Sequence, residues 1–231
     1  MSTEFRESIL VKGTDFTTSE AERGYRVLPY GTMPVADWVH SLVMRGMGYH
    51  VSIGALSTPI TGGGAGTILD LDQPEGILSV PSGYTMIPLR ISAQCHTPLL
   101  ATDADESEIL FAVDRAAAWA VDGTYTAESA FNMRTDLGAG GPIQCASAFT
   151  ADTTDPVLDI ELARAVRTGD MNGTPANALW GELSLVYEPK YPPFIVGPAM
   201  IVLYWGGTVA TTGFAQAQVA VIPSAMVKTL V

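Results

Sequence analysis

The residues of this chain that could bind a cation are acidic side chains gathered in two short stretches. Asp70, Asp72 and Glu75 form one stretch, and Asp103 and Asp105 open the other. Calcium takes about six to eight oxygen ligands, often from acidic loops, so these five carboxylates are the candidates for a bound calcium ion. Neither stretch has the ligand spacing of an EF-hand, and solvated acidic loops are the alternative interpretation.

Nucleophilic catalysis would need a serine or cysteine beside a base and an orienting acid. The sequence has no Gly-x-Ser-x-Gly motif. Cys95 and His96 are adjacent, but neighbouring residues of a strand point to opposite faces of its sheet. His40, His50 and Cys145 show no spacing typical of a catalytic or zinc site. We therefore predict a protein that is not an enzyme, with no catalytic residues and no cofactor except the calcium considered above.

The two cysteines, Cys95 and Cys145, are isolated in the sequence. Two thiols cannot form a disulfide framework, and neither belongs to a Cys-x-x-Cys pair. We interpret them as reduced thiols in the core, and a single disulfide between them remains the alternative.

The charge balance excludes several classes of protein. Among 231 residues, 12 Lys and Arg face 24 Asp and Glu, which gives a formal net charge of −12. Such a chain is too acidic to hold phosphate backbones by counterion release, and it has no basic N-terminal arm. With 47% hydrophobic residues it is also too apolar for a disordered acidic segment. We expect a folded protein that does not bind nucleic acid directly.

One short helix is predicted over Val35–Met44. Pro34 suits the first helical turn, and Gly46 suits the end. The apolar residues of this segment recur at the spacing of one helical face, namely Val35, Trp38, Val39, Leu42 and Val43.

Elsewhere, 23 glycines and 15 prolines divide the chain into short segments rich in β-branched and aromatic residues. About nine strands are expected, a pattern typical of an all-β sandwich. The longest apolar run, Phe194–Trp205, is too short for a membrane span and is interpreted as a buried strand with a break. The segments that we expect to be strands include Tyr49–Leu56, Thr67–Leu71, Gly76–Val80, Tyr84–Gln94, Ile109–Val113, Thr124–Met133, Ile143–Phe149, Leu179–Tyr187, Met200–Trp205 and Phe214–Ile222.

The domain organisation follows from this pattern. We predict an all-β protein with a jelly-roll or related Greek-key β-sandwich and one short N-terminal helix. Residues 1–30 are polar and form an N-terminal arm, 31–223 form a single jelly-roll domain, and 224–231 form a C-terminal tail. Residues 158–166 are compatible with either a strand or a helical turn. No apolar stretch follows a basic start, so a secretory signal is not expected.

The size, strand content, acidic balance and low charge of the whole chain resemble those of the single-jelly-roll major capsid proteins of icosahedral viruses. Only Lys12, Lys190 and Lys228 are lysines, against nine arginines, and this scarcity of lysine with excess acid is similar to proteins of halophilic archaea and their viruses. Together these features resemble the capsid proteins of halophilic, tailless icosahedral viruses with an internal membrane.

The resemblance implies upright jelly rolls, paired into capsomers around a lipid vesicle that holds the genome. It implies a structural virion protein, a shell subunit that assembles through β-sandwich contacts and terminal arms. The expected partners are other copies of the chain, a second capsid protein and a nearby internal membrane vesicle. The expected location is the virion capsid, assembled in the host cytoplasm. No active-site residue is implied.

Two other functions fit the sequence. A β-sandwich carbohydrate-binding or host-attachment module is favoured by polar loops and by Trp38, Trp119, Trp180 and Trp205. An acidic hydrolase would need a carboxylate pair across a cleft, and the abundance of acids makes that signal unspecific.

Overall fold

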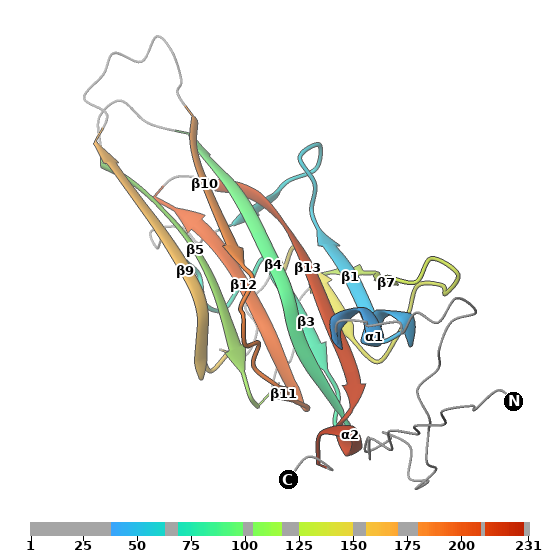
Figure 1. Ribbon diagram of the computed structural model, residues 1–231. Coiled ribbons are helices and arrows are strands. Elements are labelled where there is room, and N and C mark those ends of the chain that lie inside the picture. Colours follow the sequence, from blue (N-terminus) through green and yellow to red (C-terminus); the bar gives the residue numbers. More distant parts are fainter. Residues whose placement is uncertain are drawn as a thin grey trace, which may run out of the picture.

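The structure is a computed structural model that describes residues 38–62, 69–98, 104–116, 125–149, 156–170, 180–208 and 211–228. These residues form mainly long β-strands that run side by side in two antiparallel sheets (Figure 1). The prediction of an all-β sandwich is therefore confirmed.

The first sheet has seven strands, and its main path runs β10-β4-β13-β1-β7. Two short strands, β11 and β2, pair with β4 and β13 outside this path. The bounds are β1 (Gly48–Ile53), β2 (Ile60–Gly62), β4 (Tyr84–Pro98), β7 (Ala130–Asn132), β10 (Trp180–Tyr187), β11 (Ile195–Val196) and β13 (Thr211–Pro223).

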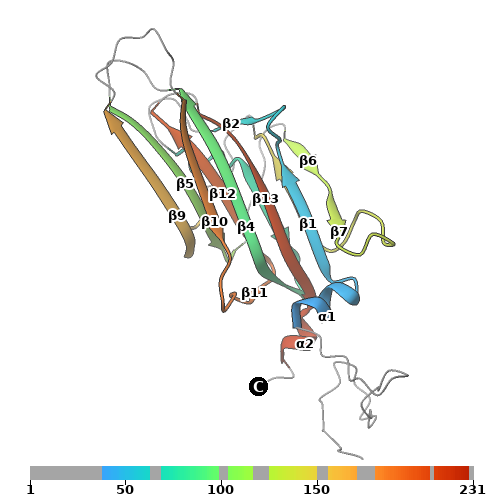
Figure 2. The ribbon, with the colours of Figure 1, turned by 45° about the horizontal axis from the view of Figure 1, so that its top comes forward.

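The second sheet has six strands in the order β6-β8-β3-β12-β5-β9. Figure 2 shows this sheet behind the first one, with β9 and β10 on the same side of the sandwich. The bounds are β3 (Gly76–Val80), β5 (Ala104–Asp114), β6 (Thr126–Glu128), β8 (Gln144–Ser147), β9 (Ile160–Asp170) and β12 (Ala199–Gly207).

Eight of these strands have the connectivity of a jelly roll. In chain order they are β1, β3, β4, β5, β9, β10, β12 and β13, and they fall into two antiparallel groups, β10-β4-β13-β1 and β3-β12-β5-β9. Consecutive strands mostly alternate between the groups, as the two Greek keys of a jelly roll require. The short strands β2, β6, β7, β8 and β11 lie in the connections.

Strand β13 shows why the sequence forms this sandwich. Its residues alternate, so that Ala215, Ala217 and Val219 are buried between the sheets while Gln216 is exposed on the outer face. This alternation is the one expected of a strand with one face in the core. The partner strand β1 places Val51 opposite Ala217 and Ile53 opposite Ala215, which brings large side chains beside small ones.

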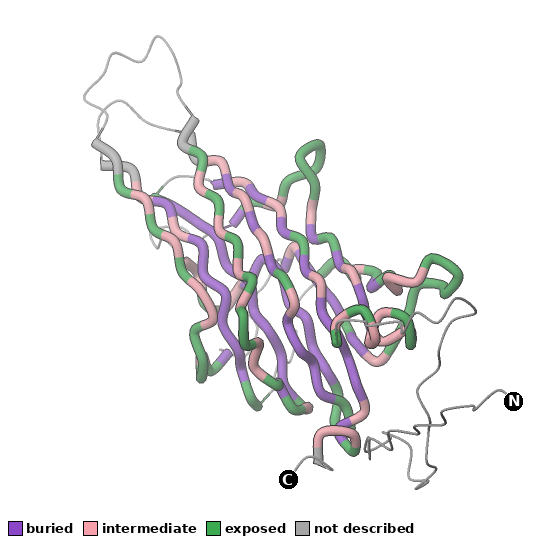
Figure 3. Tube along the Cα trace, viewed as in Figure 1, coloured by how far each residue is buried: buried purple, intermediate pink, exposed green. Residues whose placement is uncertain are grey.

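The centre of the six-stranded sheet consists of buried residues (Figure 3), and their side chains belong to apolar clusters on both faces of the sheet. Every residue of β12 is buried. Ile201, Leu203 and Trp205 pack between the sheets, whereas the alternate residues of β12 belong to a second apolar cluster on the outer face. Leu69 and Leu158, from two connections, pack against that second cluster.

Two short helices lie at one end of the seven-stranded sheet (Figure 1). Helix α1 spans Trp38–Met44, and Gly46 follows it with a φ of 75°, so the predicted helix and its glycine stop are confirmed within the described residues. Helix α2 spans Ser224–Lys228 directly after β13, inside the segment expected to be a tail. Neither helix is long and apolar enough to cross a membrane.

The acidic stretch at Asp103 differs from the prediction of a loop. Strand β5 already begins at Ala104 and pairs with β9 from there to Val113, with Glu106 opposite Thr168. An ion pair between Glu108 and Arg164 of β9 compensates one of these acids. These polar residues therefore lie in the first half of a long strand, which pairs with β9 on one side and, from Ser107 onward, with β12 on the other.

A second difference concerns Thr67–Leu71. Residues 69–71 of this segment form no strand, because the side chain of Asp70 accepts a hydrogen bond from the N–H of Asp72 at 3.2 Å. This local bond stabilises a turn in place of a strand ladder. The break expected in Phe194–Trp205 is confirmed, since a cis Gly197–Pro198 bond separates β11 from β12.

Candidate functional site

The calcium candidates whose side chains are described, Asp70, Asp72 and Glu75, do not form a metal site. Asp70 and Asp72 lie in the turn before β3. Glu75 follows them in the chain and is buried in the protein interior, with an exposed fraction of 4%. Asp103 is outside the described residues, and only the backbone of Asp105 is described, in β5. Across the described ranges, no group of three His, Cys, Asp or Glu side chains is placed to hold a metal ion.

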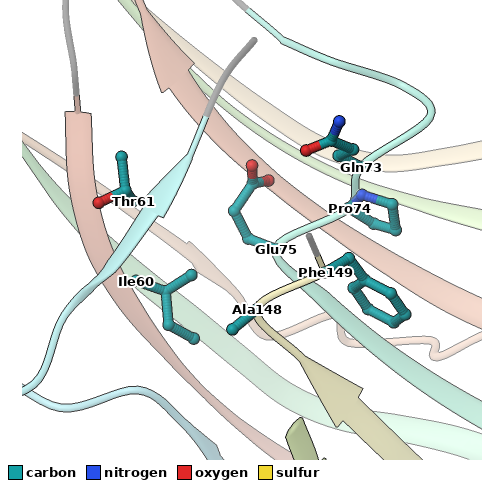
Figure 4. Close-up of a pocket in the computed structure, with 7 residues that line it drawn as sticks. All are labelled: Ile60, Thr61, Gln73, Pro74, Glu75, Ala148 and Phe149. Atoms are coloured by element: carbon teal, nitrogen blue, oxygen red, sulfur yellow. The ribbon is translucent and has the colours of Figure 1, made fainter. Parts of the chain in front are cut away.

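Glu75 has a structural role that the sequence does not reveal. Its Oε2 accepts a hydrogen bond from the backbone N–H of Trp205 at 2.9 Å. Beside the carboxylate is a cavity of about 30 Å³, large enough for about one or two water molecules (Figure 4). The cavity is lined by Ile60, Thr61, Gln73, Pro74, Glu75, Ala148 and Phe149.

The two cysteines are unpaired core residues, as expected. Cys95 lies in β4 and Cys145 in β8, so they belong to opposite sheets. Burial raises the pKa of the Cys95 thiol to about 12, and the negative charge of Glu75 adds to the effect. Burial likewise raises the pKa of Cys145 to about 12, with a smaller contribution from Glu128. Neither thiol forms the thiolate that nucleophilic catalysis needs near neutral pH.

The three histidines lie in different environments from the two buried thiols. His96 points away from the core side of β4 that Cys95 occupies, and its Nε2 is buried without a hydrogen-bond partner among the described residues. His50, on β1, has its Nε2 at 3.1 Å from the Oγ of Ser52. His40 is exposed on α1. The structure assembles no Cys-His pair from Cys95 and His96.

The outer face of the seven-stranded sheet is polar but nearly free of charge. We call the outward residues of β1, β4 and β13 the uncharged face, and exclude one charged residue, Arg90 of β4, which lies opposite Gln218 and 3.9 Å from Glu188. Charged residues occur at its margin, where Gln94 of β4 donates a hydrogen bond to Glu182 of β10. All members of the face are at least partly exposed: His50, Ser52, Ser92, Gln94, His96, Thr212, Phe214, Gln216 and Gln218.

Exposed apolar side chains gather next to this face. Val186 of β10 is 53% exposed, and Tyr191, in the connection that follows, is 82% exposed. Phe194 and Val196, at β11, are each 52% exposed. We call these four residues the apolar edge.

An apolar pocket of about 440 Å³ opens between the two helices and the end of the seven-stranded sheet. We call it the helix pocket. Ser41 and Arg45 are its two polar lining residues, and the others are apolar. The wall consists of Trp38, Ser41, Leu42, Arg45, Met47, Ile87, Phe194, Ile222, Met226 and Val227.

Trp38 and Trp205, the two tryptophans whose side chains are described, do not form a shared aromatic platform of the kind that sugar binding would use. Trp205 is fully buried and donates its indole N–H to the carbonyl oxygen of Ile60 at 3.1 Å. Trp38 lines the helix pocket. Only the backbone of Trp180 is described, and Trp119 lies outside the described residues.

Comparison with known proteins adds no relative to these observations. A scan against protein-family models finds no match, and a search of curated proteins finds no significant match. The function of the protein is therefore inferred from its fold and from the surfaces described above. They define a jelly-roll domain with one nearly uncharged sheet face and adjoining apolar side chains.

Proposed function

We propose that the protein is a structural subunit of a viral shell, and that it assembles with copies of itself through the uncharged face. The observation that carries this proposal is the jelly-roll strand order combined with an outer sheet face made mainly of Ser, Thr, Gln and His. Jelly rolls of this kind build viral capsids, although lectin domains and cupins use the same fold.

The composition of the uncharged face suits a surface that is covered by a neighbour. Charged residues are depleted in the central part of protein interfaces because their desolvation is costly. Gln and Ser side chains lose less on desolvation, and they can form hydrogen bonds across the contact. The low charged fraction of the chain, 16%, is in keeping with extensive contact between subunits.

The apolar edge supports a lateral contact on the same side of the molecule. Four large side chains in one short segment, from Val186 to Val196, are at least half exposed. Exposed apolar groups that gather in this way are typical of interaction sites. The shell would lie in the virion, with a second capsid protein and an internal membrane vesicle as further partners, and assembly would take place in the host cytoplasm.

Assembly of the purified full chain tests this function. We expect concentration-dependent growth in light scattering, and regular capsomers or sheets in negative-stain images over a range of salt concentrations. Co-expression with a second capsid protein from the same source should convert these capsomers or sheets into closed shells. A chain that stays monomeric alone and in co-expression would overturn the proposal.

Two substitutions at one position test the uncharged face. Gln216→Glu and Gln216→Arg each place a charge on the exposed centre of the face, and both should block assembly because either charge must be desolvated. Thr168→Glu and Thr168→Arg are matched controls at an exposed position of β9 in the other sheet. If both Gln216 variants assemble as the wild type does, the face is not the contact.

A further inference from the structure

The helix pocket is a large, mainly apolar hollow, and its rim is incompletely covered. Trp38 and Phe194 line it while remaining 47% and 52% exposed. A volume of about 440 Å³ lies within the range of about 300–1,000 Å³ typical of ligand sites. Beneath it, Ile87, Ala220 and Ile222 form a small buried cluster of their own.

The chain that leads into this pocket has a matching composition. The ten residues 27–36, Val-Leu-Pro-Tyr-Gly-Thr-Met-Pro-Val-Ala, carry no charge and lie directly before Asp37 and Trp38. The preceding stretch, 1–26, contains charged residues throughout its length. Residues 27–36 are therefore the part of the N-terminal segment that is suited to an apolar pocket.

The covalent connection favours the segment of the same chain over any other occupant. Val35 is three residues from Trp38, so its Cα lies within about 11 Å of a pocket wall residue. Leu28 can reach about 35 Å from Trp38, which is ample for folding back over the pocket. A short tether gives its segment an effective concentration in the millimolar range.

We propose that residues 27–36 of the same chain occupy the helix pocket and cover Trp38 and Phe194. The segment then joins α1, α2 and the end of β13 into one apolar unit. This inference does not rest on the shell function, because it concerns contacts within one subunit. It covers Phe194 and leaves Val186, Tyr191 and Val196 of the apolar edge for the proposed lateral contact.

Cross-linking of the full chain identifies the occupant. A Leu28→Cys/Val227→Cys variant, treated with the oxidant diamide, should form an intramolecular disulfide that shifts monomer mobility on a non-reducing gel. Glu20→Cys/Val227→Cys is the matched control, and it should cross-link at least tenfold more slowly. Cys95 and Cys145 should not react, because both are buried. A disulfide-linked dimer would show that the segment of a neighbouring copy fills the pocket, and equal rates for both pairs would overturn docking altogether.

Hydrogen exchange provides a second readout that does not depend on introduced cysteines. Amides of residues 27–36 should exchange at least tenfold more slowly than those of residues 13–22 in the wild-type chain. Phe194→Asp changes a half-exposed wall residue outside the apolar core clusters, so it should remove this protection while β4 and β13 stay protected. Exchange of residues 27–36 at the rate of an unfolded chain in the wild type would refute the proposal.

Discussion

The carboxylate of Glu75 accepts the backbone N–H of Trp205 at the point where β3 stops pairing with β12. The last paired residues of these strands are Gly76 and Leu203, so the N–H of Trp205 lies beyond the ladder. The Glu75 side chain therefore replaces the backbone acceptor that the strand no longer supplies. A buried N–H without such an acceptor would be costly.

Removal of this acceptor should destabilise the sandwich. Glu75→Ala leaves the N–H of Trp205 unsatisfied, and we expect a loss of about 1–3 kcal/mol in the free energy of unfolding. Glu75→Gln keeps an acceptor oxygen and should lose less. Urea unfolding followed by tryptophan fluorescence measures both. Glu188→Ala is the control, since that side chain is 66% exposed and should cost about 0–1 kcal/mol. Equal losses for Glu75→Ala and Glu188→Ala would contradict this role.

Gly62 should tolerate no side chain. A Cβ at this position would lie 2.1 Å from the carbonyl oxygen of Trp205 and 2.8 Å from Oε1 of Glu75. Gly62→Ala must therefore move backbone, and we expect a loss of about 1–3 kcal/mol in thermal or urea unfolding. Gly138→Ala is a matched control, because a Cβ there meets nothing within 4 Å. The explanation fails if both alanine variants have the stability of the wild type.

The buried thiols should make the protein less stable in alkali. The pKa of each thiol is raised to about 12 in the folded state, from 9.0. The folded state therefore keeps the protons that the unfolded chain releases, and this stability is complete below pH 9 and is lost as the pH rises toward 12. Between pH 8 and 10, the free energy of unfolding should fall by about 2–3 kcal/mol more in the wild type than in Cys95→Ala/Cys145→Ala.

The comparison uses the change in the free energy of unfolding with pH, because the alanine substitutions also change packing by an amount that does not depend on pH. All other ionisable groups are common to the two proteins, so their contribution cancels in the comparison. Parallel curves for the two proteins would show that the thiols do not titrate differently in the folded and unfolded states.

Arg134 should hold the end of α1 in place. Its Nη1 donates to the carbonyl oxygen of Met44 at 3.0 Å, and its guanidinium also pairs with Asp136. We expect Arg134→Gln to increase amide exchange in Trp38–Met44 several-fold, because a helix end loses a partner for its last carbonyls. Arg115→Gln, after β5 in the other sheet, removes the same charge elsewhere and should leave exchange in α1 unchanged. A similar increase in both variants would mean that net charge is responsible.

The sequence predicted those features that depend on local periodicity. The alternation in β13 separates Ala215 and Ala217 from Gln216, and Gly46 ends α1. Local polarity gave the wrong answer for the acidic stretch after Asp103, where pairing with β9 extends β5. The helix pocket has no sequence signal, because its walls come from α1, Ile87, Phe194 and α2, which are far apart in the chain. The role of Glu75 likewise depends on Trp205, 130 residues away.

The burial of β12 on both faces has a consequence for how this protein can change over evolutionary time. Every position of that strand is enclosed, so only substitutions that conserve volume and polarity should survive selection. The outward positions of β4 and β13 have no such packing restraint within the subunit, so only the proposed contact with neighbours would limit their change. In related chains, β12 should therefore be the most recognisable segment, whereas the outer face of the other sheet should record the divergence of their partners.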